Sequence, residues 1–280
     1  MAVTCPGKVD AHVHLTPLPP PSPSLAPPGG IERCMEALLA EMDAVGVRWA
    51  LYMAEQFVDP ARSQEEGRQV LQRSGGRQLL SVTVDPTRPA REVQKVLASW
   101  DRLEERIRAV KLYPGYQPFG INDPRVEPVL EWADRHGLPV FLHQGDVGRP
   151  TGLLKLAHPG LVDEVAVRWP RVRFVICHLG TPWTEEAATI ARKNPNVRTD
   201  CSGLLDPFSP YAARTRLLML EKIDHALSLL GDPHKLLFGS DWPNASVADS
   251  LSLIEALDVP AEHKELIWRG NAVELLGLTE

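Results

Sequence analysis

Residues 9–17 read VDAHVHLTP, a short apolar run that carries two histidines one residue apart. The apolar and β-branched residues around these histidines predict a buried β-strand. Because side chains alternate between the two faces of a strand, His12 and His14 are expected on one face, with Asp10 beside them. Two imidazoles on one face can chelate a metal ion. The alternative is that one is a core residue and the other ends the strand.

Further apolar, β-rich runs follow along the chain, each succeeded by a stretch with helical spacing. Together with the first run they predict strands at 8–15, 49–54, 79–85, 109–113, 139–144, 173–179, 196–202 and 235–240. Helices are predicted at 31–45, at 124–136 and over about 210–230, and residues 246–249 (SVAD) resemble a helix capping box. Eight strands alternating with helices predict an α/β fold, a (β/α)8 TIM barrel that forms a single domain over residues 1–280.

Composition narrows the class of partner. The 30 Lys and Arg residues against 36 Asp and Glu residues give a net charge of −6, which disfavours nucleic acid or an anionic membrane as a partner. The first residues lack a signal-peptide pattern, and the four cysteines are widely spaced, as in proteins of a reducing cytoplasm. We therefore expect a cytoplasmic protein with a small-molecule substrate. The sequence leaves a homo-oligomer open.

One segment breaks the pattern. Residues 16–30, TPLPPPSPSLAPPGG, are too rich in proline for a helix or an inner strand. They predict a stiff loop directly after the first strand, which in a barrel lies at the catalytic mouth. A partial lid and a passive insertion are both compatible with this composition.

Polar side chains follow several of the predicted strands. His143 ends the fifth run in FLHQGD, His178 ends the sixth in VICHLG, and Asp241 ends the eighth in FGSDWP. Because the carboxyl ends of barrel strands line the active site, these residues are expected to meet His12 and His14. Imidazoles and a carboxylate without a thiolate are typical of a catalytic site for Zn²⁺ or another divalent first-row ion.

As a set, the motifs DAHVHL, LHQG, CHLG and LLFGSDWP resemble the amidohydrolase superfamily, and within it the amidohydrolase-related branch of TIM-barrel metal-dependent hydrolases and decarboxylases. The segment LIWRGNAVELLGL is similar to the closing helix of that branch. The resemblance implies that His12, His14 and His143 bind the metal, and that Asp241 is a further ligand that also handles protons. It places His178 beside the metal-activated water.

Lys111 bears on the number of metals. Binuclear members of the superfamily carry a carboxylated lysine or a glutamate at the fourth strand, whereas the related branch commonly has a lysine there with one metal. We therefore expect one divalent ion, Zn²⁺ in the first place with Mn²⁺ or Fe²⁺ as alternatives, rather than two. An unmodified Lys111 is expected to pair with Asp241 or to bind an anionic substrate. A lysine at this position also argues against a nuclease.

The expected activity is hydrolysis of an amide, lactone or ester carbonyl of a small carboxylated substrate, with Asp241 and His178 as catalytic residues. The alternative is non-oxidative decarboxylation of a small aromatic or unsaturated acid on the same scaffold. A metal-binding barrel without activity is the third interpretation. Arg149 is a candidate anion clamp or a solvated loop residue. Cys177 is expected to face outward, because it precedes His178 on a strand.

Overall fold

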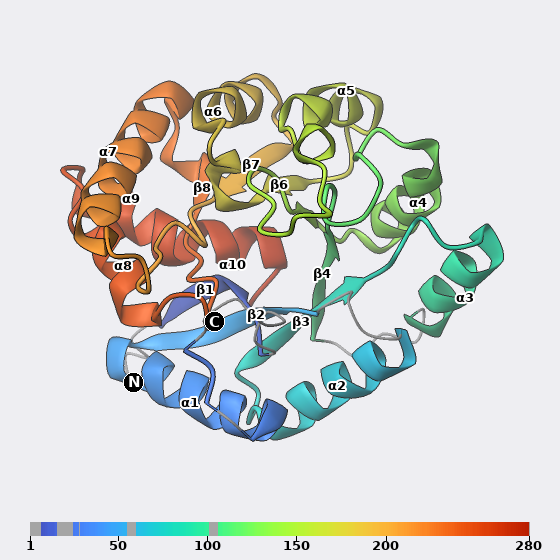
Figure 1. Cartoon of the computed structure of the whole chain (residues 1–280), viewed down its shortest axis with the longest axis horizontal. Coiled ribbons are helices and arrows are strands. Elements are labelled where there is room, and N and C mark those ends of the chain that lie inside the picture. Colours follow the sequence, from blue (N-terminus) through green and yellow to red (C-terminus); the bar gives the residue numbers. More distant parts are fainter. Residues whose placement is uncertain (1–6, 16–24, 28, 55–59, 101–105, 280) are drawn as a thin grey trace.

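The computed structural model describes residues 7–15, 25–27, 29–54, 60–100 and 106–279 (Figure 1). Most of the predicted proline-rich loop, residues 16–24 and 28, lies outside the described residues. Gly30, at the end of that predicted loop, is already the first residue of a helix. The described part of the chain contains the whole barrel wall.

The wall consists of parallel strands that pair in sequence order, as the alternation of apolar runs predicts. The strands are β1 (Lys8–Val13), β2 (Val47–Met53), β3 (Gln78–Thr83), β4 (Ile107–Leu112), β5 (Val140–Leu142), β6 (Phe174–Ile176), β7 (Val197–Asp200) and β8 (Leu236–Leu237). The barrel closes where the Ala11 amide donates to the Phe238 carbonyl (2.9 Å) and the Asp241 amide donates to the His12 carbonyl (2.8 Å). The chain is therefore a single-domain (β/α)8 barrel.

Helices surround the strands in a ring, as Figure 1 shows. They are α1 (Gly30–Val45), α2 (Pro60–Arg73), α3 (Ala90–Trp100), α4 (Glu127–His136), α5 (Gly160–Arg168), α6 (Thr184–Lys193), α7 (Ala212–Leu230), α8 (Val247–Glu255), α9 (Ala261–Glu265) and α10 (Asn271–Leu276). Short 3₁₀ turns η1 (Pro124–Val126), η2 (Leu154–Leu156), η3 (Cys177–Gly180) and η4 (Pro233–Lys235) and the π-helical turn η5 (Leu266–Gly270) complete the chain. The N-cap of the predicted capping box is confirmed, because the Ser246 hydroxyl accepts a hydrogen bond from the Asp249 amide (3.0 Å).

Apolar side chains form two buried clusters, one on each face of the strands. The larger cluster joins the outer face of the strands to the helices and includes Leu38, Val110 and Trp132. The smaller fills the barrel interior, where Phe141 and Val175 pack toward Leu275 of α10. A strand that is buried on both faces must be apolar throughout, which explains the continuous apolar runs in the sequence.

Two strands differ locally from the prediction. The ladder between β1 and β2 has a register shift between Asp10 and Val13, as at a β-bulge. At the sixth run, predicted over 173–179, β6 ends at Ile176 and the chain turns into η3. Both departures occur at the carboxyl ends of strands, where the polar side chains begin.

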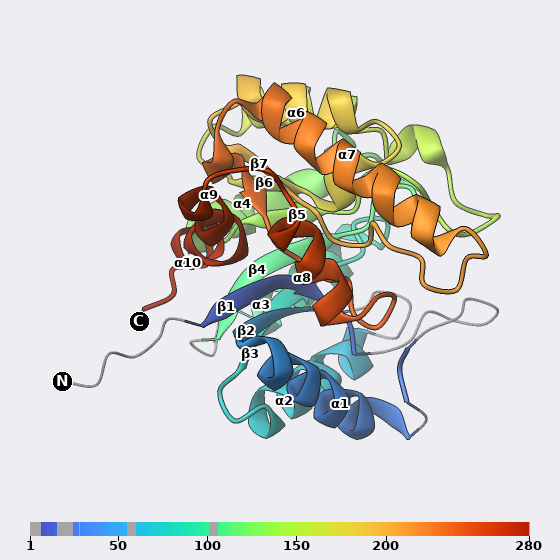
Figure 2. The same ribbon diagram turned by 90° about the vertical axis from the view of Figure 1, so that its left-hand side faces the viewer.

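The two ends of the barrel differ in what they carry. Figure 2 shows the start of β1 and the end of α10 on one side of the molecule, and the starts of α7 and α8 on the opposite side. The carboxyl ends of β7 and β8 therefore open toward the side on which α7 and α8 begin.

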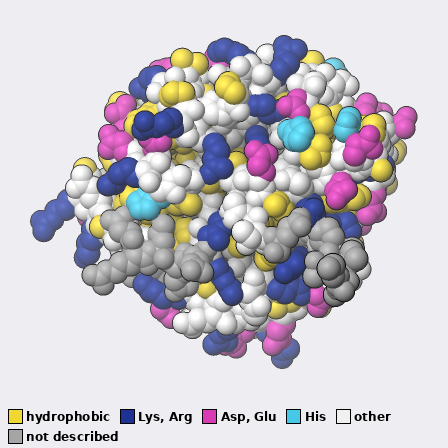
Figure 3. All heavy atoms as spheres, turned by 180° about the vertical axis from the view of Figure 1, so that it is seen from behind, with side chains coloured by type: hydrophobic (Ala, Val, Ile, Leu, Met, Phe, Trp, Pro, Cys, Tyr) yellow, Lys and Arg dark blue, Asp and Glu magenta, His cyan; other side chains and the backbone are white. Residues whose placement is uncertain are grey.

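The face seen in Figure 3 carries Lys and Arg side chains interspersed with Asp and Glu side chains. Within the described ranges, no helix is both long and apolar enough to cross a membrane.

Candidate metal and catalytic site

Three predicted ligands converge where β1 meets β8. The Oδ1 atom of Asp241 lies 3.4 Å from Nε2 of His12 and 3.3 Å from Nε2 of His14. The two imidazole centroids are 5.4 Å apart. The structure thus brings together the two histidines of the first strand and the aspartate that follows the last one.

Asp10 does not share this arrangement. Its neighbours Val9 and Ala11 both belong to the barrel-interior cluster, and its Oδ1 accepts hydrogen bonds from the Ser240 amide (3.0 Å) and the His12 amide (3.2 Å). The prediction that Asp10 lies beside the two imidazoles is therefore wrong. The β-bulge after Asp10 is the cause, because it interrupts the alternation of side chains on which the prediction depended.

The ring of His12 is held in one tautomer. Its Nδ1 lies 3.0 Å from Oδ2 of Asp200, and a carboxylate oxygen can only accept, so Nδ1 donates. Burial, assisted by the charge of Lys111, lowers the pKa of His12 to about 3, so the ring is neutral. A neutral imidazole that donates from Nδ1 has its lone pair on Nε2. That lone pair faces Asp241.

His178 is held in a similar way from the other side. Its Nδ1 lies 3.1 Å from the Ser202 carbonyl oxygen, and its amide donates to Oδ1 of Asp200 (2.9 Å). Burial also lowers the pKa of His178, so Nδ1 carries the proton and Nε2 the lone pair. The hydroxyl of Ser202 lies 2.9 Å from Nδ1 of both His12 and His178. We call these four residues, His12, Asp200, Ser202 and His178, the Asp200 network.

Three residues at the carboxyl end of the barrel have strained backbone conformations. His178, Leu179 and Asp241 have φ values of 60°, 50° and 62°, in a region that residues other than glycine rarely occupy. Such conformations persist where the surrounding structure holds them, and they cluster at functional sites. Here they turn the His178 and Asp241 side chains into the barrel mouth at the points where regular strands end.

Cys177 corrects another prediction. It was expected to face the helices, but its Sγ lies inside the barrel and accepts a hydrogen bond from Nζ of Lys111 (3.2 Å). Alternation holds as far as Cys177, which points inward like Val175. The left-handed turn at His178 then brings the next side chain inward as well, which strand geometry does not allow.

Lys111 is fully buried beneath the histidines. Its Nζ lies 3.4 Å from Nε2 of His12, and its described contacts do not include Asp241, the partner that the sequence suggested. Cys177 and Asp200 form, with His12, a second group of buried atoms that could bind a metal ion. The ammonium of Lys111 beside Cys177 disfavours a second cation at that place.

His143 lies on the other side of the mouth. Its ring centroid is 5.0 Å from that of His178 and 4.5 Å from that of Tyr116. Its Nε2 donates to the Asp146 carbonyl oxygen (2.8 Å), and burial lowers its pKa well below the usual value, so the lone pair is on Nδ1. Among the described residues, His12, His178 and Asp241 form a group whose possible ligand atoms all lie within 4.8 Å of one another. His143 is not part of this group.

Arg149, the predicted anion clamp, is half-buried in the connection that follows β5. Its guanidinium carbon lies 5.9 Å from the ring centroid of Tyr116, and the Tyr116 hydroxyl accepts a hydrogen bond from the Gly148 amide (3.1 Å). Tyr116 therefore connects Arg149 to His143. Sequence reasoning missed Tyr116, because it lies in a loop and follows no strand directly.

The sequence analysis also missed Asp200 and Ser202. The signal was present, since a charged residue within a buried apolar run must be paired or functional. Gly203, the next residue, approaches the site closely: a Cβ atom there would lie 2.8 Å from Nδ1 of His178 and 2.9 Å from Oδ2 of Asp241. The carboxyl end of β7 thus supplies the support of the site.

The charge state of Asp241 suits a metal ligand. Burial acts to raise the pKa of its carboxyl, but the hydrogen-bonding contact with His14 acts in the opposite sense, and the net pKa lies well below the usual value, so that the carboxyl is ionised. The Asn244 side chain donates to Oδ2 (2.8 Å), and the buried Oδ1 lies 3.4 Å from Nε2 of His12 and 3.3 Å from Nε2 of His14. A carboxylate oxygen that faces the lone pair of a neutral imidazole is stabilised by a cation between them. The donor set therefore fits a divalent ion.

Solved structures with this fold have several activities. An uncharacterised TIM-barrel protein from Bordetella bronchiseptica has 19% identity and a TM-score of 0.74, over 97% of this chain and 98% of that one. A probable 2-pyrone-4,6-dicarboxylic acid hydrolase from Acinetobacter baumannii, with citric acid bound, has 16% identity and a TM-score of 0.67, over 97% and 99%. A dihydroxybenzoic acid decarboxylase from a Polaromonas species, with manganese and an inhibitor bound, has 14% identity and a TM-score of 0.65, over 98% of each chain.

At these identities the likeness concerns the fold. No curated protein matches the sequence. The sequence profile of the family described as amidohydrolase, in contrast, matches residues 9–278. Because this match runs from the first strand to the last helix, the chain belongs to the amidohydrolase family.

Proposed function

We propose that the protein is a metal-dependent hydrolase that cleaves an amide, lactone or ester carbonyl of a small carboxylated substrate. One observation carries the proposal: the buried Oδ1 of Asp241 faces the Nε2 atoms of His12 and His14 at 3.4 and 3.3 Å, and the lone pair of His12 points at it. This arrangement is costly without a cation and favourable with one.

His12, His14, His143 and Asp241 would hold one divalent ion, with Zn²⁺ expected and Mn²⁺ or Fe²⁺ as alternatives. His143 would offer Nδ1, because its Nε2 donates to the Asp146 carbonyl oxygen. When bound, the ion supplies Lewis acidity, which polarises a carbonyl oxygen and makes water more acidic. Asp200 holds His12 with Nε2 toward the ion, as carboxylates do for ligating histidines.

The proton path runs through two side chains. Asp241 is ionised and can take a proton from the attacking water, while Asn244 fixes its Oδ2. His178 is neutral, with its Nδ1 proton held by Ser202, so its Nε2 can accept that proton and pass it to the leaving group. As an imidazolium it would also stabilise negative charge on the substrate oxygen.

Arg149 and Tyr116 would bind a carboxylate of the substrate on the His143 side of the mouth. Lys111, which is buried, would contribute its charge to the site through His12 rather than by contact with the substrate. The name of the Acinetobacter hydrolase specifies a dicarboxylated pyrone, which supports a carboxylated lactone as the class of substrate.

Non-oxidative decarboxylation is the second candidate. Decarboxylases share the fold, among them the Polaromonas protein with bound manganese. In that reaction Arg149 would still bind a carboxylate, and His178 or Asp241 would protonate carbon instead of relaying a proton from water. The residues at the mouth suit both reactions.

A screen of carboxylated lactones and aromatic acids would test the proposal. Each compound is incubated with metal-stripped protein and with protein reloaded with Zn²⁺ or Mn²⁺, and products and CO₂ are measured. We expect lactone opening that requires the metal. Release of CO₂ from an aromatic acid would establish the second candidate, and absence of any turnover by the reloaded protein would favour a metal-binding barrel without activity.

A further inference from the structure

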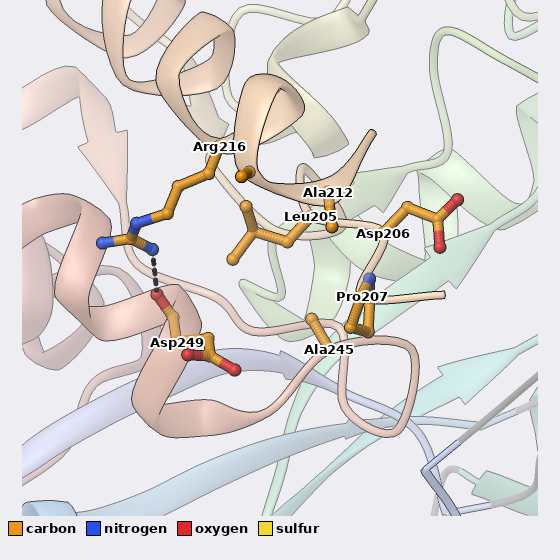
Figure 4. A pocket seen from close by; sticks show the side chains of 8 residues that line it. Leu205, Asp206, Pro207, Ala212, Arg216, Ala245 and Asp249 are labelled. Atoms are coloured by element: carbon orange, nitrogen blue, oxygen red, sulfur yellow. Dashed lines mark hydrogen bonds between the residues drawn. The ribbon is translucent and has the colours of Figure 1, made fainter. Parts of the chain in front are cut away.

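A pocket lies beside the site, between the connections that follow β7 and β8 (Figure 4). Leu205 and Pro207 line it from the first connection, Ala212 and Arg216 from the start of α7, and Ala245 from the second connection. Its volume is about 240 Å³. At about 30 Å³ per water molecule in the liquid, this is room for roughly eight waters.

Two residues of the pocket lining lie within a few residues of the catalytic site along the chain. Gly203 lies against His178 and Asp241, and Leu205 follows it by two residues, at most about 7 Å of extended chain. On the other side Asn244 binds Asp241, and the next residue is Ala245. The pocket therefore lies within reach of a substrate that reacts at Asp241 and extends along these two connections.

The lining combines apolar side chains with one cation. In Figure 4 the Leu205 side chain points into the space between Arg216 and Pro207, while the Asp206 carboxylate points away from it. The guanidinium of Arg216 donates to the Asp249 carbonyl oxygen (3.3 Å), its one hydrogen bond among the described residues. A guanidinium has five donors, so most of them are available to a ligand.

The two acidic residues of the lining are engaged elsewhere. Oδ1 of Asp206 accepts from the Phe208 amide (3.0 Å), and Oδ2 of Asp249 accepts from the Ser246 hydroxyl (2.7 Å). No salt bridge joins Arg216 to either carboxylate among the described residues. The pocket therefore offers apolar walls and a guanidinium that forms no salt bridge with the two carboxylates of the lining.

We propose that this pocket binds the distal end of the substrate, a compact apolar chain that ends in a carboxylate, with Arg216 as the residue that selects the charge. The proposal rests on the proposed hydrolase activity, because it assigns the far end of that enzyme's substrate. It also implies two carboxylate-binding positions around the mouth, at Arg216 and at Arg149.

Two esters that differ in one terminal group would test it. 4-Nitrophenyl hydrogen glutarate and 4-nitrophenyl pentanoate have acyl chains of equal length, and only the first carries a carboxylate. We expect Arg216→Gln to lower kcat/KM for the glutarate ester by roughly tenfold to a hundredfold, and to leave the pentanoate ester within about twofold. Arg91→Gln, on the exposed surface of α3, is the matched control.

Ala212→Leu would fill the pocket and should lower kcat/KM for both esters relative to 4-nitrophenyl acetate, whose acyl chain is too short to enter it. Ala98→Leu, at an exposed position of α3, controls for the added side chain. Equal effects of Arg216→Gln on the two long esters, or none, would overturn the selection of charge. An unchanged preference in Ala212→Leu would overturn the pocket.

Binding of glutarate to the same proteins, measured by NMR, separates this proposal from the activity. One outcome is that Arg216→Gln binds glutarate about tenfold or more weakly, while no ester is hydrolysed. That outcome would support the pocket and contradict the hydrolase. Hydrolysis of esters with equal glutarate binding by both proteins would support the hydrolase and contradict the pocket.

Discussion

The two sides of the barrel mouth are built differently. On the β7 side, the Asp200 network fixes His12 and His178 through the Asp200 carboxylate and Ser202, which come from a buried strand end. On the β5 side, His143 is oriented by one loop carbonyl, that of Asp146, and by the edge of the Tyr116 ring. The β7 side is a set of side chains locked to each other, whereas the β5 side depends on loops.

This difference indicates which function each side serves. Ligand positions need tight orientation, and carboxylate–histidine pairs provide it. Substrate recognition varies through loops, which carry the specificity of TIM-barrel enzymes. We therefore expect substitutions in the Asp200 network to affect metal binding and chemistry, and substitutions in the loops, around Tyr116 and Arg149 and around Arg216, to affect the choice of substrate.

The largest effect is expected from removal of a ligand. His12→Ala should lose most of the bound metal and reduce kcat/KM by more than the 10- to 100-fold typical of losing a supporting residue. His143→Ala should also lose metal, because the proposal makes His143 a ligand. Metal content is measured by plasma mass spectrometry after dialysis. Full retention in His143→Ala would leave His12, His14 and Asp241 as the ligands, and full retention in His12→Ala would contradict the site.

Gly203→Ala tests the close approach of β7 to the catalytic residues. The new Cβ would lie within 2.9 Å of His178 and Asp241, so these side chains must shift and we expect kcat to fall by at least tenfold. Gly137→Ala is the matched control, since both glycines have φ of 63° and a Cβ at Gly137 meets nothing within 4 Å. Equal losses of kcat in the two variants would show that backbone strain alone is responsible.

Asp200→Asn should weaken metal binding by about 10- to 100-fold, because an amide holds the tautomer of His12 less well than a carboxylate. Ser202→Ala should cost less, since Asp200 still accepts from His12. The measurement is competition with a chromogenic chelator. Affinities equal to that of the unmodified protein would show that the network supports the fold and not the ligand.

The smallest effect is a pH dependence of stability in the metal-free protein. The pKa of His12 is about 3 in the fold against 6.5 ordinarily, because of burial and then Lys111. The unfolded chain therefore binds more protons between these values, and the unfolding free energy rises with pH up to about 6.5. The pKa of Asp10, which burial raises to about 7, acts in the opposite sense, since its contribution is lost as pH rises toward 7.

Because Asp10 opposes His12, the test is the difference between two proteins: as pH is lowered from 6.5 toward 4, the change in Tm of the metal-free protein should be more destabilising than the change in Tm of His12→Gln. Differential scanning calorimetry of both proteins measures the two slopes. Equal slopes in the two proteins over this range would mean that His12 is charged in the folded protein.

The sequence predicted the barrel because every strand of a parallel barrel is buried on both faces, and eight apolar runs therefore stand out from the helices. It also placed His12, His14, His178 and Asp241 at strand ends, where the structure brings them together. Asp200 was not predicted, because it is not a histidine at a strand end. A carboxylate inside the buried run 196–202 was nevertheless a signal of a paired or functional residue.

Other features depend on backbone geometry that residue types do not encode. The inward position of Cys177 follows from a left-handed turn at His178 and Leu179, neither of which favours that conformation. The displacement of Asp10 follows from a bulge, and the orientation of His143 from the carbonyl of Asp146, three residues along a loop. Such details are fixed by tertiary packing, so a strand pattern cannot predict them.

Labelling with ¹⁸O tests the central claim most directly. The metal-loaded protein is incubated in ¹⁸O-labelled water with a substrate found in the screen, and the product is analysed by mass spectrometry. Hydrolysis predicts one ¹⁸O atom in the newly formed carboxylate, and a large loss of that product in His178→Asn with most of the metal retained. An unlabelled product accompanied by CO₂ would contradict the hydrolase and identify the protein as a decarboxylase.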